Sequence, residues 1–447
     1  MLSGVEASFS QTISCSASHS LSFCTDGTGR AWGRNAYGEL GYGTWPDSNV
    51  PVGVNTVTGI IAVAAGGGHS IFLKSDSTVW ASGWNAYGQL GDGSIISSNS
   101  PVQVNILTGI IAIAAGWEHC LALKSDSTVW VWGRNNFGQL GNGLITNSTT
   151  PLKINSLTGV TAISAGAYHS LIIKSDSTIR TWGRNNFGQL GNGTTIDRNV
   201  PQLVSSLSGI IAVAGGFRHS LALKSDNTVF AWGWNNYGQL GNGTYADTTL
   251  PLPVSTVTGI TAIAGGFGHS LALKNDGTVW TWGWNLYGEL GNGTNNDNNV
   301  PTQINSLTGI TTIATGGGMH SIAKENNGTV WVWGRNSYGQ LGDGTNNDSN
   351  VPVQLTELCM DMSVNDVTEM FSITIFPNPS NGNFAVTSDV EITAIEICNV
   401  LGEKVKYIPL APFKGGITID LTNQSKGIYF IKVIADDKVS TQKIIIN

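Results

Sequence analysis

The chain has 447 residues, which is more than one ordinary domain. Glycine contributes 58 residues and tryptophan 15, while charged residues make up only 11%. This composition excludes coiled coils and helical solenoids, which are rich in Ala, Glu, Lys and Leu, and ordinary disorder, which needs high charge and few aromatics. The net charge is −7 with no basic stripe, so we expect no nucleic-acid partner.

The chain begins without a clear targeting segment. Met1 to Glu6 lack the basic start and apolar core of a signal peptide. No apolar stretch reaches the about 18 residues that span a bilayer, so no transmembrane segment is expected. The five cysteines are irregularly spaced and form neither a disulfide framework nor a C-x-x-C metal pattern. At Cys15 and Cys24, two inert thiols are favoured over a disulfide across a hairpin.

An internal repeat of 50 residues, with one extra residue in the last unit, dominates the sequence. Each unit carries a histidine, then an apolar segment, a turn and a Trp-rich segment. Within a unit the apolar period is two, which indicates strands. Asp276-Gly277 is typical of the turn of a tight hairpin. The repeat histidines are His19, His69, His119, His169, His219, His269 and His320.

Four short strand candidates per unit, seven times over, predict a seven-bladed β-propeller across residues 1–355. Radial closure also explains how so many strands avoid exposed edges. A proline-containing strand follows each unit. The last of these, residues 352–355, is expected to close the ring against the first unit.

The signature G-x-N-x-[YF]-G-[QE]-L-G-x-G stands at residues 133–143 and recurs in every unit. It resembles the regulator of chromosome condensation repeat family, which implies a seven-bladed propeller. The founding member is a nucleotide-exchange factor for a small GTPase and inserts a wedge from one blade. In this sequence the variable loops after the first unit, such as residues 144–150, all have the same length. No loop among them therefore carries an inserted wedge, and exchange activity is disfavoured. Secreted bacterial members use the propeller face to bind other proteins.

The repeat stops after Leu355. Residues 356–371 are polar and aperiodic, as in a linker. Residues 372–447 contain short alternating strands with Gly and Pro turns, which predicts a small antiparallel β-sandwich.

The tail also resembles the C-terminal sorting domain of the type IX secretion system. The matching positions are Pro377, Asn378, Pro379, Gly402, Gly427, Tyr429 and Lys443. The resemblance implies contact with the secretion machinery and a location outside the cell, or on the outer surface, of a Gram-negative bacterium. Since that family requires a signal peptide, we expect the given N-terminus to be incomplete or its start misplaced. The alternative is a cytoplasmic protein with a vestigial tail.

The repeat histidines are interpreted as structural. Symmetric positions on packed sheets lie about 10 Å apart, too far to share one Zn²⁺, so no metal or cofactor is expected. We expect each histidine to bond backbone groups within its own blade. Adjacent residues such as His219 and Ser220 point to opposite faces of a strand and do not form a nucleophile–base pair. The turn residues Asp76, Asp126, Asp176, Asp226 and Asp276 are expected to cap their own backbone.

The loop from Asp343 to Asp348 could suggest Ca²⁺, but its spacing fits no EF-hand, and a solvated Asn-rich turn is favoured. No catalytic residue is assigned.

Broken symmetry marks the candidate binding positions. Arg and Trp alternate after the Trp-rich strand, and the pair before each histidine varies; both sets lie at strand ends, where propeller loops emerge. Trp, Tyr and Arg are enriched in binding hot spots. The alternative is that these indoles wedge between blades. The predicted recognition face consists of Trp84, Trp117, Tyr168, Phe217, Arg218, Trp234, Phe267 and Trp284.

These features predict a non-enzymatic, exported binding module that is monomeric and recognises a protein or glycan. The alternatives are a carbohydrate-active hydrolase, which would need a carboxylate pair in a cleft, and an exchange factor for a small GTPase.

Overall fold

The computed structural model describes residues 12–355, 358, 373–399, 404–435 and 438–447. The expected linker at 356–371 lies outside these residues except for Leu358, and so do Met1 to Glu6 and Gly402. The chain divides into two compact units, Met1–Cys359 and Met360–Asn447. In the described part, no helix is long and apolar enough to cross a membrane.

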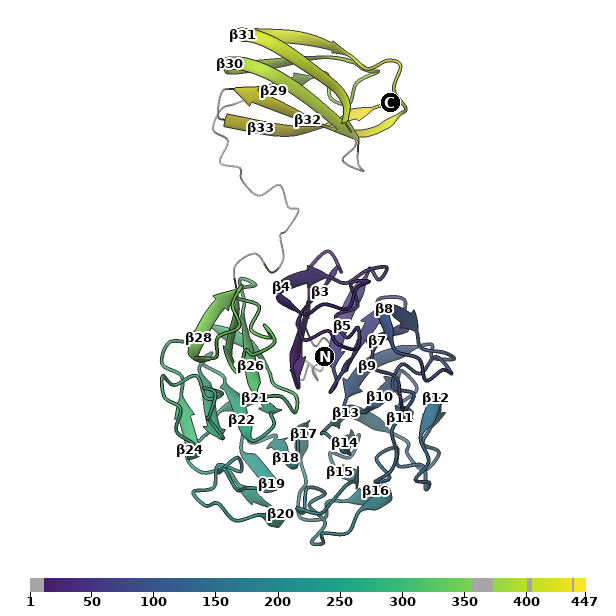
Figure 1. Cartoon of the computed structure of the whole chain (residues 1–447), viewed down its shortest axis with the longest axis vertical. Helices are drawn as coiled ribbons and strands as arrows, with labels where there is room; N and C mark the ends of the chain where they lie inside the picture. The colour runs from purple at the N-terminus through teal and green to yellow at the C-terminus, as the bar shows by residue number, and fades with distance from the viewer. Residues whose placement is uncertain (1–11, 356–357, 359–372, 400–403, 436–437) are drawn as a thin grey trace. The chain divides into compact units, whose positions relative to one another are not determined.

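The first unit is built from seven antiparallel sheets of four strands arranged around a central axis (Figure 1). Each sheet is a meander of consecutive strands. Sheets one to four comprise β1 (Ile13–Ser16), β2 (His19–Phe23), β3 (Gly29–Gly33) and β4 (Ser48–Gly53); β5 (Ile60–Ala65), β6 (His69–Lys74), β7 (Val79–Gly83) and β8 (Ser98–Gln103); β9 (Ile110–Ala115), β10 (His119–Lys124), β11 (Val129–Gly133) and β12 (Ser148–Lys153); and β13 (Val160–Ala165), β14 (His169–Lys174), β15 (Ile179–Gly183) and β16 (Arg198–Leu203).

The remaining three sheets have the same plan, so the prediction of an all-β, seven-bladed propeller is confirmed. They comprise β17 (Ile210–Gly215), β18 (His219–Lys224), β19 (Val229–Gly233) and β20 (Thr248–Pro253); β21 (Ile260–Gly265), β22 (His269–Lys274), β23 (Val279–Gly283) and β24 (Asn298–Gln303); and β25 (Ile310–Ala314), β26 (His320–Glu325), β27 (Val330–Gly334) and β28 (Ser349–Leu355).

The hydrophobic cores lie between blades. One cluster joins Ile71 and Val79 of the second blade to Ile113 and Trp132 of the third. Because both faces of each sheet are covered by a neighbour, strands such as β11, with Trp132 and Val131 fully buried, are apolar on both faces.

The ring does not close as predicted. Residues 352–355 were expected to close it against blade one, but β28 pairs with β27 and completes the seventh blade. The reason is that blade one already holds four consecutive strands, from β1 to β4, so no strand needs to be exchanged. The junction is closed by a core in which Ile13 and Trp32 pack with Ile322 and Leu355.

The cysteine interpretation is half correct. Cys15 is a buried free thiol whose pKa is raised by burial. Cys24, expected to be an inert thiol, is disulfide-bonded instead. Sequence spacing could not show this, because the two partners of a disulfide need only be close in space.

The second unit is a small antiparallel β-structure of β29 (Ile373–Phe376), β30 (Asn383–Asn399), β31 (Lys404–Asp420), β32 (Gly427–Ala435) and β33 (Lys438–Ile446). β30 pairs with β29 through its first half, with β32 through its second half and with β31 along most of its length. Phe384, Ile395, Ile431 and Ile444 therefore share one core. The predicted short antiparallel strands are therefore present, and all five belong to one sheet.

Candidate functional site

Seven histidines join neighbouring blades. Nε2 of His19 lies 2.9 Å from Oγ of Ser70, and the same pairing recurs in all seven blades, with Cys120 replacing serine once. The expectation that each histidine bonds backbone within its own blade is wrong. Because a histidine and the serine after it point to opposite faces of a strand, each histidine meets the serine of the next blade. The pairs are His19–Ser70, His69–Cys120, His119–Ser170, His169–Ser220, His219–Ser270, His269–Ser321 and His320–Ser20.

These histidine–serine pairs cannot act as a base and a nucleophile. The Ser70 hydroxyl donates its proton to the carbonyl of Glu39 at 2.6 Å, so the imidazole must donate to the hydroxyl oxygen and cannot act as its base. Burial lowers the pKa of His169 to about 3, and it lowers those of the other repeat histidines to about 3 or, for His69, to about 4. No group of histidine, cysteine or acidic side chains in the described part of the chain could hold a metal ion. The histidine belt is therefore structural.

The signature asparagine organises the loop that follows each third strand. Asn135 is fully buried; its amide donates to the carbonyls of Leu144 and Thr146, and its carbonyl accepts from the backbone N–H of Leu140. Since the loop backbone turns inward to this asparagine, loop side chains can project into solvent without changing the loop's shape. The seven loops thus form a constant frame with variable side chains.

A second belt of side chains runs around the face of the propeller from which these loops emerge. The residue after each third strand packs on the signature aromatic ring of the preceding blade in all seven blades. These pairs are Arg34–Tyr338, Trp84–Tyr37, Arg134–Tyr87, Arg184–Phe137, Trp234–Phe187, Trp284–Tyr237 and Arg335–Tyr287. Arg and Trp alternate here because each offers a flat surface to an aromatic ring.

The pair before each histidine supplies aromatics that reach farther inward. Trp117 of blade three contacts Phe217 of blade five at a ring distance of 5.0 Å, although a whole blade lies between them. Phe217 also contacts Tyr168 at 6.1 Å and Phe267 at 4.4 Å. A Cβ on Gly317 of blade seven would lie 3.9 Å from Trp117, so the Trp117 indole extends over the end of the central channel.

The structure therefore brings the predicted face residues to one side of the propeller. Phe267 contacts both Trp234 and Trp284, while Trp84 lies apart, between Tyr37 and Tyr87. Most are half-buried, but Trp234 is 7% exposed and wedges between blades. The alternative interpretation, a wedge between blades, therefore applies to Trp234, while the half-buried residues stay candidates for a recognition face.

Charge on this face is unevenly paired. Arg134 forms an ion pair with Glu118, whose side chain is buried. Arg218 lies over Phe187, Phe217 and Trp234 at 4.8, 5.2 and 5.6 Å, measured from Cζ to the ring centroids.

Sequence reasoning missed a group of exposed apolar residues in the loops of blades one to five. Ile95 and Ile96 are 64% and 74% exposed. Blades six and seven carry Asn-Asn at the corresponding positions. The signal was available in the composition of loops whose length does not vary. This apolar crescent consists of Trp45, Ile95, Ile96, Leu144, Ile145, Ile196 and Tyr245.

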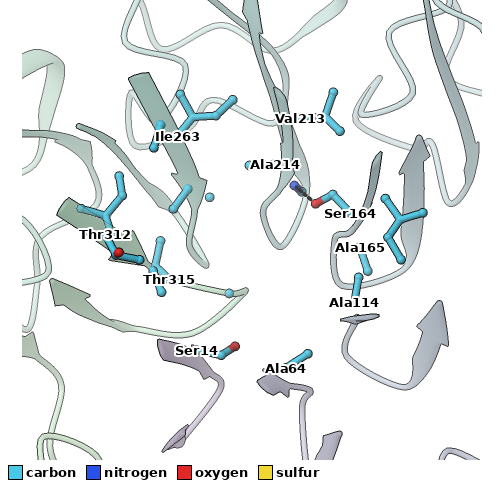
Figure 2. Close-up of a pocket in the computed structure, with 18 of the residues that line it drawn as sticks. Ser14, Ala64, Ala114, Ser164, Ala165, Val213, Ala214, Ile263, Thr312 and Thr315 are labelled. Atoms are coloured by element: carbon cyan, nitrogen blue, oxygen red, sulfur yellow. Dashed lines mark hydrogen bonds between the residues drawn. The ribbon is translucent and has the colours of Figure 1, made fainter. Parts of the chain in front are cut away.

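The inner strands enclose a central cavity of about 740 Å³ (Figure 2). Its wall combines hydroxyls at Ser14, Ser164 and Thr312, alanines such as Ala64 and Ala114, and branched aliphatic side chains such as Val213 and Ile263. Ser164 accepts a hydrogen bond from the backbone N–H of Gly215 at 3.1 Å. Among the described residues, no charged side chain lines this cavity.

The turn carboxylates have structural roles. Asp76 accepts from the backbone N–H and the hydroxyl of Thr78 at 3.0 and 2.6 Å, and these bonds lower its pKa to about 2. Asp343 and Asp348 likewise accept from Thr345 and Asn336 within their own loop. The self-capping prediction for the turn residues is confirmed.

The sorting-motif residues meet at the end of the second unit. The Asn378 amide donates to the carbonyl of Lys443 at 2.7 Å and accepts from the backbone N–H of Ile445 at 3.0 Å. Pro377 and Pro379 flank Asn378. Gly427 and Tyr429 lie on β32, where the Tyr429 hydroxyl donates to the Ser425 carbonyl at 2.6 Å.

Comparison with protein families agrees with both units. Residues 2–268 match the RCC1-like domain, and residues 276–323 and 327–368 match the regulator of chromosome condensation (RCC1) repeat. A second RCC1 repeat model matches residues 260–289 and 310–340. Residues 374–447 match the secretion system C-terminal sorting domain. A comparison with curated proteins gives no significant match.

Solved structures include similar propellers. Human WBSCR16 is 26% identical with a TM-score of 0.66, covering 74% of this chain and 94% of its own. Prp20p from Saccharomyces cerevisiae, described with its binding properties to Gsp1p and histones, is 25% identical with a TM-score of 0.68, covering 83% and 92%. Yeast RCC1 (Prp20) bound to Kap60 is 23% identical with a TM-score of 0.66, covering 83% and 91%.

Proposed function

Because the chain belongs to the RCC1-like domain family, whose propellers are generally non-catalytic, we propose that it is an exported binding module that recognises a protein or glycan. Its C-terminal sorting domain indicates export and the cell surface or extracellular space in Bacteroidetes. In this proposal the propeller binds the ligand, and the C-terminal tail contacts the secretion machinery.

The apolar crescent carries this proposal. Ordinary surfaces expose single hydrophobic residues, whereas clusters of them mark interaction sites. Five neighbouring blades each expose at least one such side chain from a loop held by a buried asparagine. Aliphatic side chains such as Ile96 and Ile145 offer no hydrogen bonds to sugar hydroxyls, so the crescent favours a protein partner. The half-buried Trp117 and Trp284 would add an aromatic surface nearer the axis.

Capture by the full chain tests the proposal. The immobilised chain is incubated with proteins and glycans of the cell exterior, alongside a variant carrying Ile95→Asn, Ile96→Asn and Ile145→Asn. The matched control, Leu203→Asn with Leu252→Asn, removes exposed aliphatics from outer strands instead. We expect the crescent variant to lose the ligand and the control to keep it. Equal capture by all three chains would overturn the proposal.

The alternatives have less support. A carbohydrate-active hydrolase needs two carboxyl groups flanking a bond. Near the aromatic cluster the Glu118 carboxylate is engaged by Arg134. Nucleotide exchange would need a surface to replace the wedge of the founding member. A hydrolysis assay on polysaccharides and a nucleotide-release assay test these two.

A further inference from the structure

Two arginines lie against one tyrosine at the face of the proposed function, and a third lies over the phenylalanine that this tyrosine contacts. The Tyr168 ring centroid lies 5.9 Å from Cζ of Arg134 and 5.7 Å from Cζ of Arg184. Tyr168 also contacts Phe217, over which Arg218 lies. Burial, and then the charge of Glu118, raise the pKa of Tyr168, while the charges of the three arginines act in the opposite direction. We call Arg134, Arg184, Arg218 and Tyr168 the arginine cluster.

Apart from the pair between Arg134 and Glu118, the guanidinium N–H donors of the cluster have no acceptor among the described residues. Each guanidinium carries five N–H groups. Among the described residues, neither the Arg184 guanidinium nor the Arg218 guanidinium makes a hydrogen bond or an ion pair, and Nε of Arg218 is buried with no partner. Burial, and then the charge of Arg184, lower the pKa of Arg218. A buried donor without an acceptor costs free energy, and this cost applies to Nε of Arg218.

Neighbouring carboxylates do not compensate. Glu118 is paired with Arg134. Asp197, in the loop after Arg184, accepts from the backbone N–H of Asn185 at 2.7 Å, and Asp247 accepts from that of Asn235 at 2.7 Å. Three cations therefore face one engaged anion in a chain whose net charge is −7.

The rings also fix the direction of the cations. Arg184 lies over Phe137 at 4.7 Å and Arg218 over Phe187 at 4.8 Å, both rings belonging to preceding blades. A guanidinium with its flat surface against a ring presents its N–H groups at the edge, where a planar carboxylate can accept two of them. The cost of ordering these side chains is already met in the free protein.

We propose that the arginine cluster binds a carboxylate-bearing segment of an acidic protein, with apolar residues of that segment against the crescent. This rests on the proposed function and names its partner class. The crescent favours a protein over a sulfated or uronic glycan with the same negative charge. The carboxylates Asp47, Asp197 and Asp247 in the crescent loops imply that the acidic group binds at the centre and not at the rim.

A peptide of alternating leucine and glutamate tests the proposal against the full chain by titration calorimetry at low and high salt. We expect it to bind about tenfold or more tightly than its leucine–glutamine counterpart, with an affinity that salt weakens. Arg184→Gln with Arg218→Gln should remove that advantage. The control variant, Arg30→Gln with Arg180→Gln, has the same charge change on strands away from the cluster and should keep it.

Circular dichroism first establishes that both variants fold. Unchanged binding of the glutamate peptide by Arg184→Gln/Arg218→Gln would overturn the inference. Tighter binding of a sulfated oligosaccharide through the same two arginines would overturn the choice of a protein. If the crescent variant loses its captured ligand while the arginine variant keeps it, the inference fails and the proposed function stands.

Discussion

His320 and Ser20 join the last blade to the first, with Nε2 of the histidine 2.7 Å from Oγ of the serine. Ser20 in turn donates to the carbonyl of Gln340 at 2.9 Å. At the other six junctions the chain itself connects the two blades. Here the junction depends on side chains, on the core around Ile13 and Trp32, and on bonds such as that from Gly344 N–H to the Asn49 carbonyl at 2.8 Å.

Ser20→Ala should therefore loosen blade one locally. The substitution leaves the His320 donor unsatisfied, at a cost of about 1–3 kcal/mol. Hydrogen exchange of the β1 and β2 amides should accelerate. The control, Ser170→Ala, removes the same bond at a junction that the chain spans, and its local exchange should change less. Equal acceleration in both variants would show that His320–Ser20 has no special role in closure.

The histidine belt predicts unfolding in mild acid. Burial lowers the pKa of His119 and His219 to about 3, whereas the unfolded value is about 6.5. The stability that neutral histidines provide is complete above pH 6.5 and is lost as the pH falls towards the folded value. At pH 5 each histidine lowers the free energy of unfolding by roughly 2 kcal/mol. The sum over seven histidines exceeds the total stability of many domains.

Near-ultraviolet circular dichroism against pH measures this transition. His219→Gln keeps a donor for Ser270 but does not titrate, so the pH dependence of its unfolding free energy should be shallower by one group. A chain that keeps its tertiary signal at pH 4 would contradict the prediction.

Two buried glutamates predict the opposite trend at higher pH. Glu39 and Glu289 stand where the other five blades have glutamine, and one carboxyl oxygen of each has no partner. Burial raises their pKa values to about 7 and about 8. The unfolded chain loses these protons near pH 4.5, so the folded state loses stability as the pH rises from there towards 8.

Glu39→Gln and Glu289→Gln should therefore stabilise the chain at pH 9 by at most about 3 and about 5 kcal/mol respectively, and have little effect at pH 4.5 to 5. Urea unfolding at several pH values measures this. Glu325→Gln is the control, because Glu325 is only half-buried and both of its carboxylate oxygens have a donor, one from Trp331 and one from Asn327. A benefit of equal size there would contradict the explanation.

The blades could be predicted because their signals are local. The spacing from His219 to His269 and the alternation in β23 both lie within one unit. The way in which the ring closes could not be predicted, because the sequence pattern of residues 352–355 is compatible with pairing to β1 and with pairing to β27. The serine partner of each histidine could have been predicted, because alternation along β2 places the side chains of His19 and Ser20 on opposite faces of the sheet.

The functional residues were predicted unequally. Conspicuous breaks in symmetry, such as Trp117 and Arg218, led to the aromatic cluster. The crescent was missed because Ile95 and Ile145 lie in loops whose length was examined and whose composition was not. That the Arg134 guanidinium has a carboxylate partner while the Arg184 guanidinium has none among the described residues is a matter of three-dimensional position, which a sequence with seven equivalent units does not reveal.

The signature glycines set the distance between blades, and one loop holds a matched pair that tests this. Gly238 and Gly243 have φ values of +81° and +80°. A Cβ on Gly238 would lie 2.4 Å from Cα of Asn299 in the next blade, whereas nothing lies within 4 Å of a Cβ on Gly243. Gly243→Ala should cost about 1–2 kcal/mol for the left-handed backbone alone.

Gly238→Ala should cost that amount plus about 1–3 kcal/mol more, because the blade behind it must move. Chemical denaturation of the two variants separates steric contact from backbone strain. If both lose the same free energy of unfolding, the close approach at Gly238 does not hold the blades at their spacing, and the interblade bond from Gly243 N–H to the Asn299 carbonyl at 3.0 Å would have to do so.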